Sequence, residues 1–428
     1  MKLAIVVQRY GADINGGAEQ HARYIAERLA RHASVEVVTT CARDYVTWKN
    51  ELPAGVEQVN GIPVRRFPVA HERKPHEFGR RSAQVFDAPH SLADELRWLE
   101  SEGPASPELL DYVERAAPGL DFVVLFSYRY HHAWHLARRI PEKAVVVPTA
   151  ERDAAIGLSI FGPVLRGVRA LMYNSPEERA MIQAAARNAA VPGVVVGVGS
   201  DVPEHPDAER FRRTFKMTRP FAIYIGRIDE NKGCPELFSH FQRYASAFPR
   251  GLDLVLVGRA IIDVPKHPRI HHLGFLDDSD KFDALAAADL LIMPSYYESL
   301  SMVALEAWAL GRPVLANAHC DVLKGQCIRS NAGLYYESYE EFVEALYSLE
   351  SNGPLNARLG RNGREFFRQN YAWPVIERKY LDMFDRLKKD TAAARPALSP
   401  LPGWFARRRK DVPASRDVLA RLPRGSAA

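Results

Sequence analysis

The chain has 428 residues, of which 47% are hydrophobic and 25% charged, and its formal net charge is +5. This length exceeds one ordinary core and suits two or three domains of a soluble globular protein. No run approaches the roughly 20 consecutive apolar residues of a membrane-spanning helix. Residues 391–428 hold eight Arg or Lys and two Asp, a balance of +6, so the other 390 residues sum to −1. A nearly neutral body argues against a nucleic-acid partner.

The two ends of the chain and its cysteines bear on location. The apolar run Leu3 to Val7 is too short for the core of a signal peptide, so we expect a cytoplasmic protein. The four cysteines form no Cys-x-x-Cys pair, which predicts reduced thiols and no structural zinc site. The tail 391–428 is rich in Pro, Ala and Arg and is predicted to be disordered. Its cluster from Trp404 to Lys410 suits peripheral contact with the anionic inner face of a membrane, and a solvated tail is the alternative.

A strand, a loop, a helix and a second strand are predicted in the first forty residues. After the strand Leu3 to Val7, the pair Gly16-Gly17 opens a stretch with helical apolar spacing, and Val35 to Val38 forms the next strand. This β-α-β unit predicts a parallel sheet. Further strands are predicted at 122–126, 144–147, 170–173 and 194–196. The stretch 43–120 is irregular with short helices, and we interpret it as an insertion that shapes a cleft.

A stretch rich in Pro and charge, 201–219, is predicted to be a linker, after which the alternation of strands and helices restarts. The second set comprises strands at 221–225, 254–257, 290–293 and 314–316 and helices at 235–247, 279–288, 300–310 and 339–350. Further helices are predicted over 354–390. The chain is therefore predicted to be α/β, with one doubly wound domain over 1–200 and a second over 220–353. Ligands are expected at the carboxyl ends of the strands.

The most specific motif places two carboxylates across the start of a helix. Glu306 lies eight residues after Glu298, and the predicted helix begins between them. The free N–H groups of a first helical turn bind phosphate, and carboxylates accept hydrogen bonds from sugar hydroxyls. This pattern suits a ligand built of a sugar, a diphosphate and a ribose. The alternative is that Glu298 only places a favourable charge at the helix N-terminus and that Glu306 is a surface residue.

A second motif places two cations on one loop. Arg227 and Lys232 lie five residues apart on a loop that Gly226 opens, directly after the strand 221–225. The Arg fork and the Lys ammonium can converge on a diphosphate. A solvated loop whose charges pair locally is the alternative.

Four motifs together resemble the donor-binding half of the family 4 glycosyltransferases. They are the loop Gly226 to Gly233, the segment His272 to Leu276, the pair Pro294-Ser295, and Glu298 with Glu306. Members of that family have the GT-B fold, two facing Rossmann-like domains with a cleft between them. The resemblance covers about residues 1–388, specifically in the second half and more loosely in the first.

The resemblance implies roles for individual residues. Arg227 and Lys232 would hold the donor diphosphate, Glu298 would contact the transferred sugar, and Glu306 would bind the ribose hydroxyls. The further donor contacts that it implies are the base-facing Gly274, Phe275 and Leu276, the glycines Gly16, Gly17 and Gly226, and the helix-start residues Ser299, Leu300 and Ser301. Fixed cations would carry the diphosphate charge, so no metal is expected. We interpret Asp278-Ser279-Asp280 as a helix cap rather than a metal-binding D-x-D motif.

Two features depart from the family pattern. The commonest family version has Gly-Phe-Gly where this chain has Ser299-Leu300-Ser301, which keeps the backbone N–H groups available. Many members carry a histidine in the loop after a central strand of the first domain. Here His131 and His132 come several residues later than the simplest alignment would place one. They are candidate catalytic residues, and the alternative is a pair of helix-start histidines that face solvent.

The activity that the resemblance implies is retaining, metal-independent transfer of a hexose from a nucleotide-diphosphate sugar. The acceptor would be a saccharide, a lipid-linked or a small molecule, in polysaccharide or other glycoconjugate synthesis. Glu151, Arg152 and Asp153, after the strand 144–147, are candidate acceptor-binding residues, with a salt-bridged loop as the alternative. A nucleotide-sugar epimerase, another GT-B enzyme and a non-catalytic nucleotide-sugar binder stay open. An NAD-dependent dehydrogenase does not, because the first strand lacks a following G-x-G-x-x-G.

Overall fold

The computed structural model describes residues 1–14, 16–390, 417 and 420–421. The chain forms two compact units, one of Met1–Val196 with the segment from Lys379 onward, and one of Gly197–Arg378. Apart from three isolated positions, the predicted tail lies outside the described residues, and its membrane contact stays a prediction. None of the described helices is long and apolar enough to cross a membrane.

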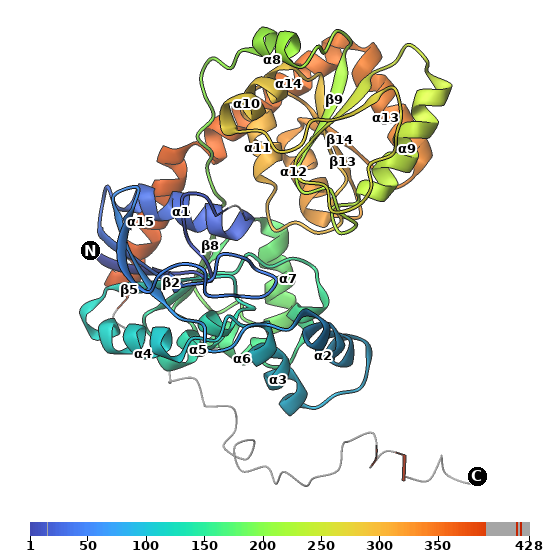
Figure 1. Cartoon of the computed structure of the whole chain (residues 1–428). Coiled ribbons are helices and arrows are strands. Elements are labelled where there is room, and N and C mark those ends of the chain that lie inside the picture. Colours follow the sequence, from blue (N-terminus) through green and yellow to red (C-terminus); the bar gives the residue numbers. More distant parts are fainter. Residues whose placement is uncertain (15, 391–416, 418–419, 422–428) are drawn as a thin grey trace. The chain divides into compact units, whose positions relative to one another are not determined.

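An eight-stranded sheet forms the centre of the first unit (Figure 1). Its order is β3-β4-β2-β1-β5-β6-β7-β8, and all neighbours are parallel except β3 and β4. The strands are β1 (Lys2–Val6), β2 (Ser34–Thr40), β3 (Gly55–Val59), β4 (Ile62–Phe67), β5 (Phe122–Phe126), β6 (Ala144–Val147), β7 (Ala170–Tyr173) and β8 (Gly193–Val195). The helices before β8 are α1 (Gly17–Leu29), α2 (Pro75–Asp87), α3 (Leu92–Glu102), α4 (Pro107–Ala116), α5 (His131–Arg139), α6 (Phe161–Gly167) and α7 (Pro176–Ala186), with short 3-10 turns η1 (Ala117–Gly119) and η2 (Ala154–Gly157).

Burial on both faces explains the apolar central strands. Every residue of β5, Phe-Val-Val-Leu-Phe, is buried, as expected for a parallel strand covered by helices on both sides. Figure 1 shows α1 on one face of this sheet and α4, α5 and α6 on the other. Trp98 of α3, Trp134 of α5 and Phe161 of α6 belong to one core cluster with the strands.

The hairpin β3–β4 is a structured part of the predicted insertion, which we expected to be irregular with helices alone. Its turn is Asn60-Gly61, with φ of 49° and 79°, the left-handed geometry of a tight hairpin turn. β4 then pairs in parallel with β2 and extends the sheet. The insertion also contributes α2, α3 and α4.

The second unit contains a six-stranded, wholly parallel sheet in the order β11-β10-β9-β12-β13-β14. Counted from β9, this is the 3-2-1-4-5-6 order of a doubly wound nucleotide-binding sheet. The strands are β9 (Phe221–Ile225), β10 (Asp253–Val257), β11 (Ile270–His272), β12 (Leu290–Met293), β13 (Val314–Asn317) and β14 (Gly333–Tyr336). The helices are α8 (Ala208–Thr214), α9 (Cys234–Ala247), α10 (Asp278–Ala287), α11 (Met302–Ala309), α12 (Asp321–Ser330), α13 (Tyr339–Ser351) and α14 (Gly353–Asn370). Figure 1 shows α9 and α13 on one face and α10, α11 and α14 on the other.

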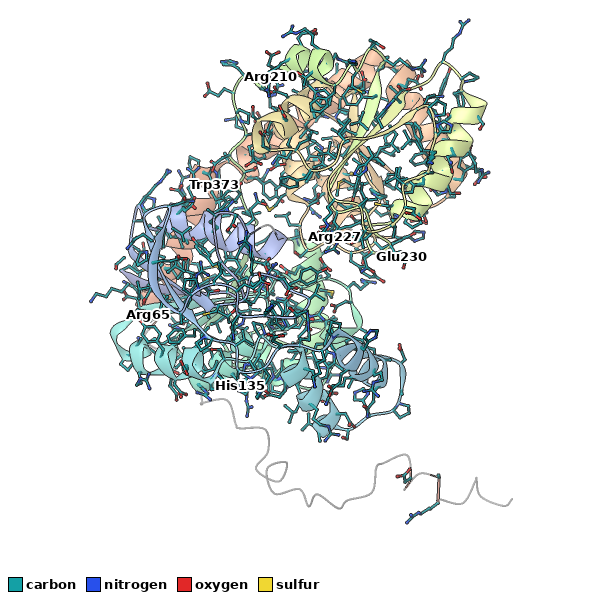
Figure 2. All side chains as sticks on the ribbon, viewed as in Figure 1. Arg65, His135, Arg210, Arg227, Glu230 and Trp373 are labelled. Carbon is teal, nitrogen blue, oxygen red and sulfur yellow. The ribbon has the colours of Figure 1, made fainter. Side chains whose placement is uncertain are left out.

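Two segments differ from the predicted domain plan. The expected linker 201–219 contains α8, which packs on α10 and joins it through an ion pair of 2.5 Å between Arg210 Nη2 and Asp283 Oδ2 (Figure 2). The expected helical segment 354–390 is divided between the units, and its first helix, α14, belongs to the second unit. α14 packs on α11 so closely that a Cβ on Gly360 would lie 2.1 Å from the Gly311 oxygen.

The last helix, α15 (Trp373–Lys389), has residues in both units. Its beginning belongs to the second unit, where Trp373 Nε1 donates to Asp201 Oδ1 at 2.8 Å. Its end belongs to the first, where Phe384 stacks on Phe122 with ring centroids 5.2 Å apart. Apolar spacing predicts a helix here but not which unit it packs on.

Candidate functional site

The strand order of the second unit creates a topological switch point between β9 and β12. These two central strands are parallel neighbours, and the chain leaves them toward opposite faces of the sheet. Ligands of doubly wound sheets bind in the crevice beyond the carboxyl ends of such a pair. Both sequence motifs of this unit follow these strands, since 226–233 comes after β9 and 294–301 after β12.

Two glycines allow the loops at the switch point to touch backbone to backbone. Gly233 has φ of 69°, and a Cβ there would lie 2.1 Å from the Pro294 oxygen. Gly258 has φ of 135°, and a Cβ there would lie 2.0 Å from the Gly226 oxygen. Because glycine has no side chain at either position, the loops after β9, β10 and β12 can approach one another closely at one edge of the sheet.

The predicted cation loop and the predicted acidic motif meet through one ion pair. Lys232 Nζ donates to Glu298 Oε1 at 2.6 Å, with Glu298 largely buried. Arg227 pairs instead with Asp229 of its own loop, and Asp229 also accepts from the Lys232 backbone N–H at 2.8 Å. Arg227 lies at the exposed end of the loop, with 40% of its side chain accessible (Figure 2). Both cations therefore sit at the switch point, each beside a carboxylate that can give way to a bound anion.

The helix after β12 starts as the sequence predicts. The Ser301 hydroxyl caps α11 by accepting from the Ala304 N–H at 3.2 Å, while Ser299 and Leu300 lie in the loop before it. The first-turn N–H groups of α11 thus face the same edge as Glu298, a suitable position for phosphate oxygens.

Glu306, on α11, is only 2% exposed. Its Oε1 accepts from Ser200 Oγ at 2.8 Å and from Lys281 Nζ at 3.3 Å. Its Oε2 is buried and has no hydrogen-bond partner among the described residues. A buried carboxylate oxygen without a donor is costly, and a ligand hydroxyl would satisfy it. Sequence analysis missed Lys281, whose only local signal is a helical charge pair with Asp278.

The segment after β11 presents an aromatic ring at the same edge. Phe275 is 70% exposed, although it is a large apolar residue. The preceding Gly274 has φ of 74°, and its oxygen accepts from the Gly258 N–H at 2.7 Å. The segment Gly274-Phe275-Leu276 is therefore anchored by backbone to the loop after β10 and keeps the Phe275 ring available.

A second polar network, which sequence analysis also missed, supports the loop after β12. The Tyr296 hydroxyl donates to Glu236 Oε2 at 2.8 Å, and Asn317 Nδ2 donates to Glu236 Oε1 at 3.2 Å and to the Pro294 oxygen at 3.1 Å. Burial and the neighbouring Glu236 carboxylate raise the pKa of Tyr296 to about 12. Tyr296 therefore stays a neutral donor that fixes the loop.

In the first unit, the predicted glycine loop lies between β1 and α1. Gly16 precedes the helix with extended backbone, and Gly17 is its first residue. A Cβ on Gly16 would lie 2.2 Å from Glu19 Oε2. Arg9 and Glu19, both buried, form an ion pair of 2.6 Å beside it. A side chain at Gly16 would therefore displace the Glu19 carboxylate, whereas Gly17 has open space around it. Contact of this loop with a donor stays a prediction.

His131 and His132 begin α5, and both are buried, so the alternative of two solvent-facing histidines is wrong. His132 Nε2 lies 3.2 Å from the Phe126 oxygen, and burial lowers the pKa of His132 to about 3. The His132 ring is therefore expected to be neutral at physiological pH, and its role in catalysis stays a prediction. His131 Nε2 lies 3.3 Å from Glu100 Oε2.

The three candidate acceptor residues follow β6. Asp153 caps η2 by accepting from the Ala155 N–H at 3.1 Å, and it pairs with Arg129. Arg129 also pairs with Glu102 at 2.7 Å, which gives Asp153 a structural role. Glu151 is partly buried and Arg152 exposed on the same loop. Their contact with an acceptor stays a prediction.

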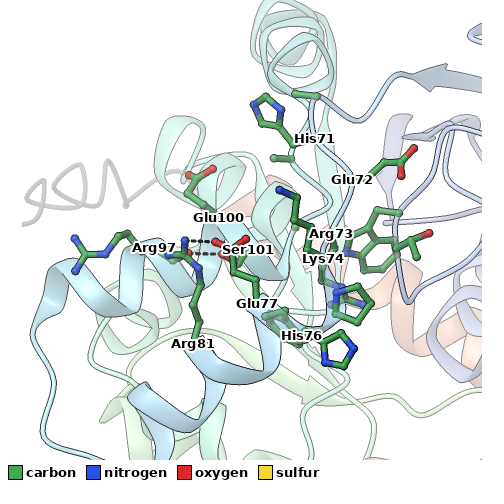
Figure 3. A pocket seen from close by; sticks show the side chains of 17 residues that line it. His71, Glu72, Arg73, Lys74, His76, Glu77, Arg81, Arg97, Glu100 and Ser101 are labelled. Atoms are coloured by element: carbon green, nitrogen blue, oxygen red, sulfur yellow. Dashed lines mark hydrogen bonds and ion pairs between the residues drawn. The ribbon is translucent and has the colours of Figure 1, made fainter.

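A cavity of about 990 Å³ lies in the first unit, within the insertion (Figure 3). Its wall includes Trp48, Arg73, Lys74, His76 and Glu100. These residues follow β2 and β4 or end α3, so the cavity opens at the carboxyl edge of this sheet too. Sequence analysis expected an insertion that shapes a cleft and did not identify these residues.

Comparison with protein families bears on the second unit. Residues 206–366 match the family described as Glycosyl transferases group 1. The matched segment lies within the second unit, Gly197–Arg378. The match confirms the predicted resemblance and includes every candidate residue of the second unit.

Curated proteins are similar to this chain at low identity. Glycogen synthase from Mycobacterium tuberculosis is 24% identical over 215 residues, which cover 48% of this chain and 51% of that protein. A phosphatidyl-myo-inositol mannosyltransferase from Propionibacterium freudenreichii is 30% identical over 211 residues, 47% of this chain and 53% of that protein. The chain thus spans about half the length of the curated relatives it matches.

Solved structures match most of the chain, including residues of both units. A sucrose-phosphate synthase from Thermosynechococcus elongatus has a TM-score of 0.66 at 17% identity and covers 90% of this chain and 99% of that one. HepE of Anabaena, solved in complex with UDP, has a TM-score of 0.65 at 16% identity. The match covers 90% of this chain and 100% of that one. These likenesses confirm the GT-B fold.

Proposed function

We propose that this protein is a glycosyltransferase that moves a sugar from a nucleotide-diphosphate sugar to an acceptor hydroxyl. The observation that carries the proposal is the convergence of Lys232, Glu298 and the start of α11 at the switch point, next to the buried Glu306 with its unsatisfied oxygen. The family match of residues 206–366 supports the same activity.

Each part of a nucleotide-diphosphate sugar has a matching group in the second unit. The ribose hydroxyls suit Glu306, whose Oε2 lacks a donor. The diphosphate suits Arg227, Lys232 and the first-turn N–H groups of α11. The transferred sugar suits Glu298, and the nucleobase suits the exposed ring of Phe275 and the backbone around Gly274. HepE was solved with UDP and with UDP-glucose, which supports a donor of this class.

The proposed transfer retains the configuration at the anomeric carbon. The acceptor oxygen attacks from the face that the diphosphate leaves, so the carbon–phosphate-oxygen bond breaks as the new glycosidic bond forms. The acceptor proton passes to an oxygen of the departing diphosphate. Fixed cations stabilise the charge that develops on this leaving group. No carboxylate need form a glycosyl-enzyme, unlike in the retaining hydrolases.

Metal independence is part of the proposal, because Lys232 and Arg227 take the place of a divalent cation at the diphosphate. The cap of α10 is Asp277 and not the expected Asp278-Ser279-Asp280, which form the first turn. Asp280 pairs with Arg210 at 2.9 Å. Their structural role supports the absence of a catalytic metal motif there. Transfer is expected to persist in EDTA, measured at a temperature where the fold is intact. Complete loss of transfer in EDTA, with activity restored by Mg²⁺ or Mn²⁺, would contradict metal independence.

For the acceptor, we propose the cavity of the first unit. It opens at the carboxyl edge of the sheet, where ligands of doubly wound domains bind, and His71, Lys74 and His76 on its wall suit a hydroxylated or acidic saccharide. The acceptor class that we propose is a saccharide or a lipid-linked saccharide, and the similarity to a glycogen synthase supports the first of these.

The test is a thermal-unfolding screen with UDP-, GDP-, ADP- and dTDP-sugars, followed by product analysis with the donor that binds. A donor at 100 times its Kd should stabilise the fold by about 2.7 kcal/mol. Transfer to added saccharides, with release of the nucleoside diphosphate, supports the proposal. Sugar release or epimerisation that needs no acceptor would replace it with a nucleotide-sugar epimerase. Binding without turnover would replace it with a non-catalytic binder.

A further inference from the structure

Three potential metal ligands converge in the first unit. His131 and His135 lie one turn apart on α5, on the same face of the helix, and Glu100 lies on α3. One ligand atom from each of the three lies within 4.8 Å of the other two. Figure 2 labels His135 on this helix.

Each histidine lies farther from Glu100 than in a strong hydrogen bond, at a separation that leaves room for an ion. His131 Nε2 lies 3.3 Å from Glu100 Oε2, and His135 Nε2 lies 3.5 Å from Glu100 Oε1. Charge-assisted hydrogen bonds are shorter, about 2.7–2.9 Å. Ligand atoms that each lie 2.0–2.1 Å from a tetrahedral zinc ion are about 3.3 Å apart. His135 Nε2 is buried and makes no hydrogen bond of good geometry among the described residues.

The neighbouring charges do not supply another partner for the carboxylate. Among the described residues, no Lys or Arg pairs with Glu100. Arg97, one turn before it, pairs with Asp94, and Arg139, one turn after His135, pairs with Asp111 and Glu114. Among the described residues, Glu100 is the carboxylate that pairs with both imidazoles.

The ligand types select the metal. Two imidazole nitrogens and one carboxylate are a common zinc set and leave a fourth position for water or a ligand. Imidazole also suits Co²⁺ and Ni²⁺, whereas Mg²⁺ and Ca²⁺ prefer all-oxygen sites. The expectation of no zinc site rested on cysteine spacing, and this cluster contains no cysteine.

We propose that Glu100, His131 and His135 bind a divalent transition metal ion, of which Zn²⁺ fits best, that clamps α3 to α5. Of the three ligands, Glu100 also lines the 990 Å³ cavity (Figure 3). The leaving diphosphate is assigned to Arg227 and Lys232 of the second unit, not to this ion.

The test titrates the EDTA-stripped full chain with Co²⁺, monitored by visible absorption, and with Zn²⁺ in competition with a chromogenic chelator. His135→Gln and Glu100→Gln each remove one ligand, and both side chains are partly exposed, so the fold should tolerate them. His90→Gln is the matched control, since His90 pairs with one carboxylate, Glu95, at 3.0 Å without a second histidine.

We expect one equivalent of metal to bind to the wild type and the control, with a tetrahedral Co²⁺ spectrum. Each ligand variant should bind at least about tenfold more weakly. Zn²⁺ should raise the unfolding midpoint of the wild type and the control only. The proposal would be overturned if the wild type did not bind one equivalent of metal, or if the wild type and both ligand variants bound it with equal affinity. Glu100 would then form only ion pairs with the two histidines.

Discussion

Lys232 Nζ donates a 2.6 Å hydrogen bond to Glu298 Oε1 and so joins the loop after β9 to the loop after β12. The two residues are 66 positions apart in the sequence. The pair holds a cation and an acid at the switch point of the second unit, where each is expected to bind a different part of the donor. An incoming diphosphate would compete with Glu298 for Lys232 and leave the carboxylate for the sugar.

The first prediction concerns this cation. Lys232→Ala should lower kcat by about a hundredfold or more, as when one preorganised donor to a developing negative charge is removed. Arg227→Ala should have an effect of the same kind. Lys324→Ala is the control, because it breaks a Lys–Glu pair of 2.9 Å in the same unit. Turnover within threefold of wild type in both site variants would show that neither cation supports the leaving group.

The second prediction separates the two carboxylates. Glu306→Gln should weaken both the nucleoside diphosphate and the intact donor, because Glu306 is assigned to the ribose. Glu298→Gln should leave affinity for the nucleoside diphosphate near wild type and lower kcat, because its contact is with the reacting sugar. Calorimetry with the two ligands and separate turnover assays measure these effects. If Glu298→Gln weakens the bare diphosphate as much as Glu306→Gln does, both acids belong to the nucleotide.

The third prediction concerns the exposed ring of Phe275. Phe275→Ala should weaken nucleotide binding by roughly tenfold, since stacking of a base on an aromatic ring contributes about 1–3 kcal/mol. Tyr347→Ala removes another exposed aromatic of the same unit and should leave the affinity unchanged. Unchanged affinity in the Phe275 variant would assign base recognition to backbone groups alone.

The fourth prediction concerns acid stability. His21 is fully buried against Phe126, and burial lowers its pKa from 6.5 to about 3. Between these values the unfolded chain binds a proton that the folded chain excludes. The contribution of His21 to stability is therefore complete above about pH 6.5 and falls as the pH drops toward 3, by at most about 1.4 kcal/mol per pH unit.

Urea unfolding at several pH values between 5 and 7 measures this slope. His21→Phe should reduce the loss of unfolding free energy on acidification, and His205→Phe, at an exposed position, should not. Identical slopes in the wild type and the His21 variant would assign the acid sensitivity to other groups.

Much of the fold was predictable from local pattern. The alternation of apolar runs with helical spacing predicted two doubly wound sheets, because a strand covered on both faces must be apolar along its length. The hairpin β3–β4 was missed although Asn60-Gly61 is a strong local signal for it. The helix α8 was taken for linker because Pro and charged residues surround it, and its docking on α10 depends on Asp283, far along the chain.

The sequence by itself determined the α/β class, the order of the motifs and the residue types of the candidate donor site, because these depend on periodicity and on short spacings. Only the tertiary structure decided which charges meet. It paired Lys232 with Glu298, left one oxygen of the buried Glu306 without a donor, and brought Glu100 to His131 and His135. Such contacts join segments that are distant in the chain. Their geometry depends on how loops and helices pack at one edge of a sheet, and local sequence does not encode that packing.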